Sequence, residues 1–370
     1  MKRSTLRLTQ AVVLGFMASF PITSSAQTPL LPGVAQSSPQ AQQSFDKGRM
    51  LIKQNQIAQG IQWLDKAAAE GHAHAAYELA ALYESGLGVK RDYNRSKAFY
   101  ELAIRHGHRD AHFNLALLFN SKFVPFNNLQ QARKLMHVVA NQGDLEAQFV
   151  LATMMSESSG GISSNPSQAL HWFGRAANRG HEKAQFQLGM QYLKGQNVAR
   201  DAQLAHHWFT EAAKKNVAGA HFNLALMHER GDGVAADTDT AIRWYTTAAD
   251  LGNANAQQNL GIKYLLGEQV AANTHKALNL IERAATSGLR NSQLLLGQLY
   301  QSGYEGKVQI NMAKAEQWYL RAAKQGQPDA QYQLALILLD KNNQKSKAEF
   351  WIQQAAAAGH QDAMKLQATL

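Results

Sequence analysis

Small and large apolar residues recur along this chain at a helical spacing, in blocks of about 36 residues. One residue that ends each block makes the period visible, and we call it the turn residue. It stands at Gly71, Gly107, Gly143, Gly180, Asn216, Gly252, Gly288, Gly326 and Gly359. A constant period near 36 residues is typical of a solenoid built from helix pairs.

The positions after each turn residue predict the first helix of a pair. The fourth position is small, the twelfth is usually large, and the eighth is leucine in every full block: Leu79, Leu115, Leu151, Leu188, Leu224, Leu260, Leu296 and Leu334. Because a spacing of four places side chains on one helix face, each block begins with a helix of about 14 residues.

The positions before each turn residue predict the second helix. All six tryptophans stand eight residues before it: Trp63, Trp172, Trp208, Trp244, Trp318 and Trp351. We expect this column to be core, so that a Trp→Ala change costs ~3–5 kcal/mol. Asp92, Asp201, Asp237 and Asn273 are predicted to cap the start of their second helices.

The N-terminal segment has no such period. Basic residues precede an apolar stretch over 8–20, and small residues follow at Ser24 and Ala26. This pattern predicts a signal peptide over residues 1–26, because the apolar stretch is too short for a membrane span. Residues 27–43, with three prolines, predict a disordered linker.

The repeats are then expected over residues 44–370 as one continuous array. The last segment, residues 361–370, is predicted to be a capping helix. The units are expected to start near residues 44, 72, 108, 144, 181, 217, 253, 289 and 327.

Composition narrows the classes of function. The absence of cysteine excludes a disulfide scaffold, a thiol nucleophile and a cysteine-built zinc site. Without Lys2, Arg3 and Arg7, the 37 basic residues become 34 against 27 acidic ones, and the net charge falls from +10 to +7. The remaining basic residues are scattered, so we expect no nucleic-acid partner. We also expect no integral membrane segment after signal removal.

The fourteen histidines are the main candidates for site chemistry. His72 with His74, His106 with His108, and His206 with His207 are close in sequence, but four histidines simply follow a turn glycine. No His-Glu-x-x-His spacing, nucleophile elbow or phosphate loop is present. We therefore expect no catalytic residue, no metal site and no cofactor.

The repeated unit resembles the Sel-1-like repeat of the tetratricopeptide superfamily. Residues 75–92, 184–195, 220–252 and 315–326 follow its pattern, and the resemblance covers about residues 41–370. It implies an all-α, right-handed superhelical solenoid of about nine antiparallel helix pairs. A branch of this family associated with β-lactams carries a disulfide in each repeat, which this cysteine-free chain cannot form.

The resemblance also implies a concave binding face lined by first helices at positions 3, 6, 7 and 10 after the turn residue. Position 7 offers polar groups that could bind a peptide backbone or be plainly solvated: Glu78, Asn114, Gln187, Asn223, Asn259 and Gln333. Position 6 offers Phe113, Phe149, Phe186 and Phe222, for which packing between repeats is favoured. Phe123 and Phe126, in a proline-containing loop, either pack on the neighbouring unit, which is favoured, or dock on a partner.

Together these features predict a non-catalytic adaptor that binds another protein or peptide. The signal-peptide pattern of residues 1–26 predicts an exported protein, and we expect it to be periplasmic or secreted in a Gram-negative bacterium. One alternative is a peptidoglycan-associated protein or regulator of a cell-wall hydrolase. A less favoured alternative is a β-lactam-processing enzyme.

Overall fold

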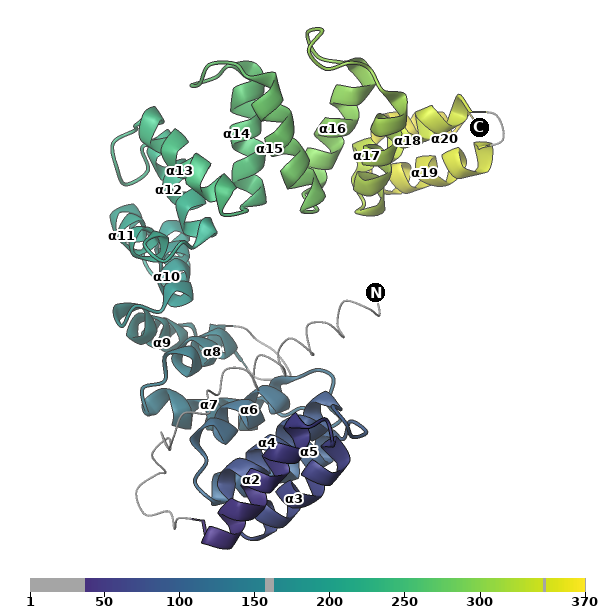
Figure 1. The fold of residues 1–370 in the computed structure, drawn as a ribbon. Helices are drawn as coiled ribbons and strands as arrows, with labels where there is room; N and C mark the ends of the chain where they lie inside the picture. Colours follow the sequence, from purple (N-terminus) through teal and green to yellow (C-terminus); the bar gives the residue numbers. More distant parts are fainter. Residues whose placement is uncertain (1–36, 157–162, 342–343, 370) are drawn as a thin grey trace. The chain divides into compact units, whose positions relative to one another are not determined.

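The computed structural model describes residues 37–156, 163–341 and 344–369, and it is all-helical over these ranges apart from one isolated bridge between Tyr304 and Val308 (Figure 1). The predicted signal peptide lies outside the described residues. The nineteen helices of this part are α2 Pro39–Lys53, α3 Ile57–Ala69, α4 Ala73–Ser85, α5 Tyr93–Arg105, α6 Arg109–Asn120, α7 Leu129–Asn141, α8 Leu145–Ser156, α9 Pro166–Asn178, α10 Glu182–Lys194, α11 Ala202–Ala213, α12 Ala218–Arg230, α13 Thr238–Asp250, α14 Ala254–Leu266, α15 Thr274–Thr286, α16 Arg290–Ser302, α17 Met312–Lys324, α18 Pro328–Leu339, α19 Lys345–Ala357 and α20 Gln361–Gln367.

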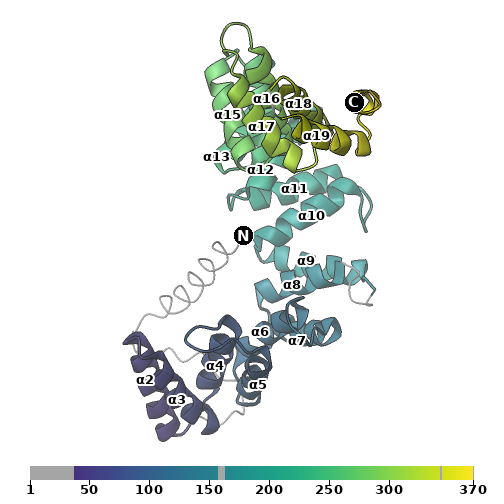
Figure 2. The same ribbon diagram turned by 90° about the vertical axis from the view of Figure 1, so that its right-hand side faces the viewer.

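The helices pack in consecutive pairs, from α2 with α3 to α18 with α19, and α20 packs on α19 (Figures 1 and 2). We number the pairs repeats 1 to 9. The chain divides into two compact units, residues 1–181 and 182–370. The all-helical fold of paired helices predicted from the period is therefore confirmed.

The first helix starts earlier than the predicted linker allows. The linker was expected to extend to residue 43, but α2 begins at Pro39. Ser38 caps this helix, because its hydroxyl accepts a hydrogen bond from the backbone N–H of Ala41, and proline suits the first turn. The predicted caps of four second helices, including Asp92 and Asp237, also accept backbone hydrogen bonds as expected.

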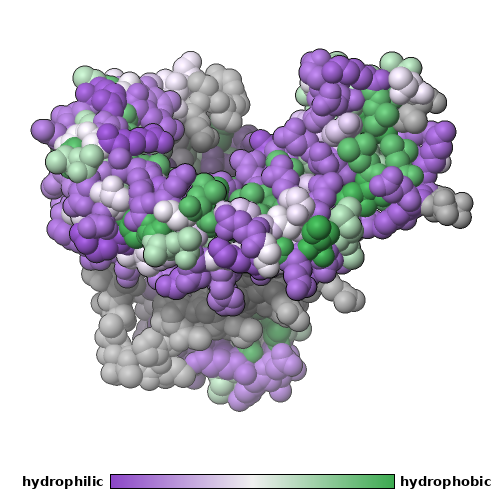
Figure 3. Space-filling model, turned by 90° about the horizontal axis from the view of Figure 1, so that it is seen from above, coloured by the Kyte–Doolittle hydropathy of each residue, from purple (hydrophilic) through white to green (hydrophobic). Residues whose placement is uncertain are grey.

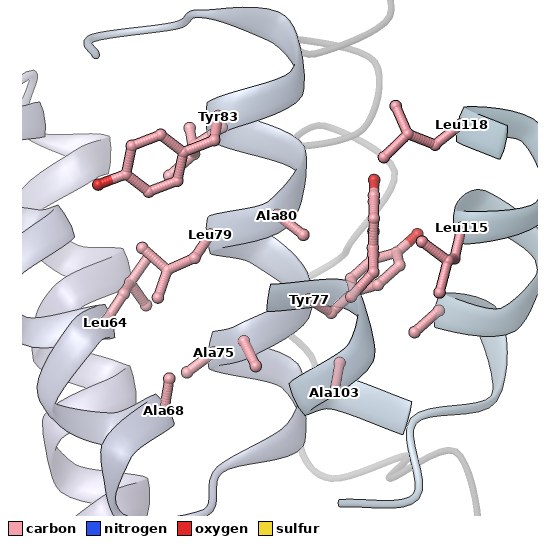
Figure 4. Packing of buried hydrophobic residues seen from close by; sticks show 14 of the residues in the cluster. Leu64, Ala68, Ala75, Tyr77, Leu79, Ala80, Tyr83, Ala103, Leu115 and Leu118 are labelled. Carbon is pink, nitrogen blue, oxygen red and sulfur yellow. The ribbon is translucent and has the colours of Figure 1, made fainter. Parts of the chain in front are cut away.

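The core column of the second helices lies seven residues before the turn residue, one position after the tryptophans. It is buried in all nine repeats: Leu64, Tyr100, Met136, Phe173, Phe209, Tyr245, Ile281, Tyr319 and Ile352. Figure 4 shows Leu64 pointing toward Leu79 of the next first helix, while Ala68 approaches Ala75. At this boundary a leucine thus meets a leucine and an alanine meets an alanine, and the alanines let the two helices approach closely.

The prediction that the tryptophan column forms the core is wrong for five of its six members. Trp172 is buried, but the other five tryptophans are only half-buried. A basic side chain covers some of these rings: Lys47 Nζ lies 3.9 Å from the centre of Trp63, and the Arg321 guanidinium lies 4.5 Å from that of Trp318. The five half-buried tryptophans therefore border the core, and Trp63 and Trp318 each turn one ring face to a cation.

A column of buried polar side chains, which the sequence did not reveal, joins successive repeats. The amides of Gln148, Gln257, Gln293 and Gln331 each donate a hydrogen bond of 2.9–3.2 Å to a backbone carbonyl eight residues earlier. Those carbonyls belong to the last turn of the preceding second helix, where intrahelical partners run out. Each glutamine thus caps one repeat from the next and fixes their register.

Candidate functional site

Where a histidine precedes the next first helix, the aromatic side chain at position 6 stacks on it. Tyr77 stacks on His108 with ring centres 4.1 Å apart, and Phe149 stacks on His181 at 4.9 Å. Position 6 is half-buried in the phenylalanine row predicted from the sequence: Phe113, Phe149, Phe186 and Phe222. This placement favours packing between repeats.

Several polar side chains at position 7 belong to a hydrogen-bonded group around the hydroxyl of a buried tyrosine, which we call a tyrosine site. Tyr100, from the core column of repeat 2, donates a hydrogen bond of 2.8 Å to Glu84, and Asn114 of repeat 3 lies 3.5 Å from the same hydroxyl. Asn114 also donates to the hydroxyl of Tyr77 at 2.8 Å. Burial raises the pKa of Tyr100 well above its ordinary value, so the hydroxyl keeps its proton and donates.

The same site recurs wherever the core column holds tyrosine. Tyr245 donates to Glu229 at 2.6 Å and bonds Asn259 of the next repeat. Tyr319 donates to Gln301 at 2.5 Å, and Gln301 in turn donates to Gln333 of the next repeat at 3.3 Å. Three of the predicted groove residues, Asn114, Asn259 and Gln333, therefore help to satisfy buried polar groups inside the protein.

Two further position-7 residues have other partners. Glu78 forms an ion pair of 3.3 Å with Arg49. Burial raises the pKa of Glu78 to about 7, against the opposing effect of Arg49 and Lys53. Asn223 donates to the carbonyl of Gly219 in its own helix at 2.7 Å, whereas Gln187 is exposed.

The first helices of the unit formed by residues 182–370 share a pattern of one polar and one apolar residue. Four of its five first helices carry an amide at position 7 and an apolar residue three positions later: Gln187 and Met190, Asn223 and Leu226, Asn259 and Ile262, Gln333 and Leu336. Residues three apart are neighbours on a helix surface. All four apolar side chains are only half-buried, so each helix presents an amide beside a partly accessible apolar group.

The proline-containing loop splits its two phenylalanines between packing and exposure. Phe126 is half-buried and meets Phe119 edge-on with ring centres 6.0 Å apart, and Val124 is buried beside it. Phe123, in contrast, is 86% exposed. The favoured packing interpretation describes Phe126, and Phe123 is left as a solvent-facing aromatic ring.

Neither a polydentate metal cluster nor a membrane span is found in the described ranges. No group of three or more His, Asp or Glu side chains there is arranged to hold a metal ion. No described helix is both long enough and apolar enough to cross a bilayer. On the face seen in Figure 3, hydrophobic residues form small groups among hydrophilic ones.

Paired helices with a recurring register define the class of this molecule, a helical-repeat protein. The Sel1 repeat model matches nine consecutive segments of the chain, which therefore belongs to the Sel1 repeat family. The matched segments are residues 43–72, 73–108, 109–144, 145–181, 182–217, 218–253, 254–289, 291–327 and 328–360. Sel1 repeat proteins generally act as protein–protein interaction scaffolds, and the fold is typically non-catalytic.

Two solved structures illustrate the similarity. A Sel1 repeat protein from Oxalobacter formigenes is 26% identical, with a TM-score of 0.72 over 85% of this chain and 97% of that one. The c5321 protein, a protective antigen of uropathogenic Escherichia coli with an SLR fold, is 28% identical, with a TM-score of 0.65 over 88% of this chain and 71% of that one. No curated protein matches the chain.

Proposed function

We propose that this protein is an exported, non-catalytic scaffold that binds a partner protein through the first helices of residues 182–370. The observation that supports this assignment is the amide–apolar pair repeated on four of the five first helices. Protein interfaces combine apolar anchors with hydrogen-bonding groups at their margins. An amide offers both a donor and an acceptor, which suits the backbone of an extended peptide.

The spacing of the pairs also fits an extended partner. The first helices α10, α12 and α14 of three successive repeats carry the same two groups, so a chain lying across them meets equivalent contacts in turn, and α18 carries the pair again after α16, which lacks it. Asn259 and Gln333 each use part of their hydrogen-bonding capacity inside the protein. Gln187, which is exposed, is therefore the amide that we propose contributes most to partner binding.

Export is part of this proposal, and it rests on the sequence pattern of residues 1–26. The protein then acts in the periplasm or outside the cell. A fusion of residues 1–26 to a reporter that is active only after export tests this part separately. An inactive reporter that accumulates in the cytoplasm would contradict it.

Affinity capture from the producing cells tests the binding surface. The test variant is Q187A/M190A/I262A, which removes surface groups and leaves the tyrosine sites intact. The control variant is Q203A/T246A/Q317A, on exposed positions of second helices. We expect the test variant to recover at least about tenfold less partner, as loss of ~1.4 kcal/mol of binding energy would produce, and the control to match the unchanged protein.

Equal recovery by both variants would overturn the assignment to this surface. Each variant is first compared with the unchanged protein by circular dichroism, so that a loss of fold is not mistaken for a loss of binding. Co-sedimentation with purified sacculi provides a second arm. Recovery of the chain with sacculi but with no protein would contradict the scaffold and favour the peptidoglycan-associated alternative.

A further inference from the structure

One contact between repeats departs from the pattern of the others. Position 12 of the first helix is a tyrosine, phenylalanine, methionine or leucine in seven of the eight full blocks. In repeat 6 it is His228, on α12. The side chain that His228 meets across the boundary between repeats is His206, on α11 of repeat 5. His228 thus takes the place of a large aromatic or apolar side chain, and it meets a second imidazole there.

The two rings face one another through the same nitrogen. Their Nε2 atoms lie 3.3 Å apart, and the ring centres are 5.3 Å apart with planes inclined by 73°. A tetrahedral zinc ion with Zn–N bonds of ~2.0–2.1 Å holds two such nitrogens roughly 3.3–3.4 Å apart. The pair therefore already has the separation that two ligands of one ion require.

The accessibility of the pair also suits a metal ion, which binds an imidazole through its unprotonated nitrogen. Both side chains are only half-buried, which leaves room for solvent to complete the coordination.

Without a metal ion, the two neutral rings share one N–H···N hydrogen bond of 3.3 Å, in which the tautomers decide the donor. The buried Nδ1 atom of His228 makes no hydrogen bond to any described residue, so the ring is not held in place from its other side. The sequence grouped His206 with its neighbour His207, but His207 turns to Trp208, with ring centres 5.0 Å apart. The partner of His206 comes from the next repeat, 22 residues further along the chain.

We propose that His206 and His228 form a two-histidine site for a divalent transition-metal ion of the zinc class. The ion bridges α11 and α12, with water molecules as its remaining ligands. This site revises the expectation from sequence that the chain holds no metal. It does not depend on the proposed scaffold function.

Calorimetric titration of the full chain with Zn²⁺ tests the site. The variants are His206→Gln, His228→Gln and the double variant, since glutamine keeps a polar group of similar reach. The matched control is His207→Gln, which removes an adjacent imidazole that does not face the pair. The other histidines are common to all samples, so the comparison isolates this site.

We expect the unchanged protein to bind one more equivalent of Zn²⁺ than the double variant does. Each single variant should weaken that binding at least about tenfold, since even outer partners of metal ligands contribute ~10–100-fold in affinity. The control should keep it. Equal titrations of the unchanged protein and the double variant, or equal losses in all single variants including the control, would overturn the proposal.

A second measurement remains informative if a variant folds poorly. Co²⁺ added to the unchanged protein should give the visible absorption of a cobalt–imidazole complex, and one equivalent of Zn²⁺ should displace it. The absence of that absorption would also overturn the site.

Discussion

Repeats 2 and 9 carry the same histidine stack but surround it differently. His108 follows the turn residue of repeat 2 and stacks on Tyr77, and His360 follows the turn residue of repeat 9 and stacks on Tyr332 at 4.5 Å. His360 has the carboxylate of Asp329 3.5 Å away. At the position equivalent to Asp329, repeat 2 has His74, whose ring centre lies 4.6 Å from that of His108.

The difference shows how one residue of the repeat changes the electrostatics of an otherwise constant structure. Repeat 4 resembles repeat 9, because His181 has Glu146 at 3.0 Å. A carboxylate stabilises a protonated imidazole, whereas a second imidazole repels it. Burial, reinforced by the nearby histidines, lowers the pKa of His108 to about 3.

His72 extends the same cluster toward the first repeat. It caps α4 through Nδ1, which accepts from the Ala75 N–H at 3.2 Å, while Nε2 faces Gln42 at 3.1 Å. Burial and the neighbouring His74 lower the pKa of His72 to about 4. Protonation of Nδ1 would remove the cap, so the helix start depends on a neutral ring.

The carboxylates around His72, His74 and His108, which we call the histidine cluster, do not outweigh the effect of burial on its pKa values. Asp46 of α2 and Asp110 of α6 favour protonation of His72 and His74 respectively, and Arg49 opposes it at His74. His112, also on α6, is a further imidazole whose pKa burial lowers. Burial outweighs the two carboxylates, so the cluster is neutral at pH 7.

Replacing His74 with glutamate should have the largest single effect on this contrast. H74E places a carboxylate where repeats 4 and 9 have one, so the pKa of His108 should rise. At pH 5 the free energy of unfolding grows by ~1.4 kcal/mol for each unit by which the His108 pKa exceeds 5, and a rise that stays below 5 changes little. We therefore expect the loss of unfolding free energy between pH 7.5 and pH 5 to be smaller in H74E than in the unchanged protein, by up to about 1 kcal/mol. Urea unfolding measured at pH 7.5 and pH 5 checks this.

The matched control is His112→Gln, which removes a neighbouring imidazole without adding a carboxylate. It should recover less acid stability than H74E. If NMR titration shows the same His108 pKa in H74E and in the unchanged protein, the residue at this position does not set the difference between repeats.

Replacing Asp329 with asparagine should have a smaller effect in the opposite direction. The Asp329 side chain is 60% exposed, and exposed ion pairs contribute ~0–1 kcal/mol. We expect D329N to lose at most about 0.5 kcal/mol of unfolding free energy. Urea unfolding in low and high salt measures this, since salt screens an exposed ion pair, and a loss that high salt leaves unchanged would show that the pair is not electrostatic.

The sequence predicted the helix pairs and their register well, because the turn residue, the leucine at position 8 and the alanines recur at fixed spacing. It misplaced the core column of the second helices by one residue. Adjacent helix positions differ by about 100° around the axis, so two neighbouring large residues point in different directions. The recurring tryptophan, such as Trp318, predicted one direction, but the core lies on the side of the next residue, Tyr319. Which of the two faces the core depends on the neighbouring helices.

The candidate site was less predictable for the same reason. Asn114 and Asn259 looked like free groove amides, but each meets a buried tyrosine of the preceding repeat. The signal was present in the sequence as a coincidence of tyrosine, an acid or amide 16–18 residues earlier, and an amide 14 residues later. Contacts between helices of different repeats decide which polar groups are occupied, and a single-helix pattern does not contain them.

Hydrogen exchange at pH 7.5 and pH 5 tests the central contrast most directly. The folded pKa values of His72 and His108 lie below the unfolded value of ~6.5, so folding releases protons there. Their contribution to stability is complete above that value and is lost as pH falls toward about 4 and 3. After correction for intrinsic exchange rates, we predict that α4 and α6 lose protection at pH 5 while α18 and α20 keep theirs. Equal loss in all four helices would contradict the account.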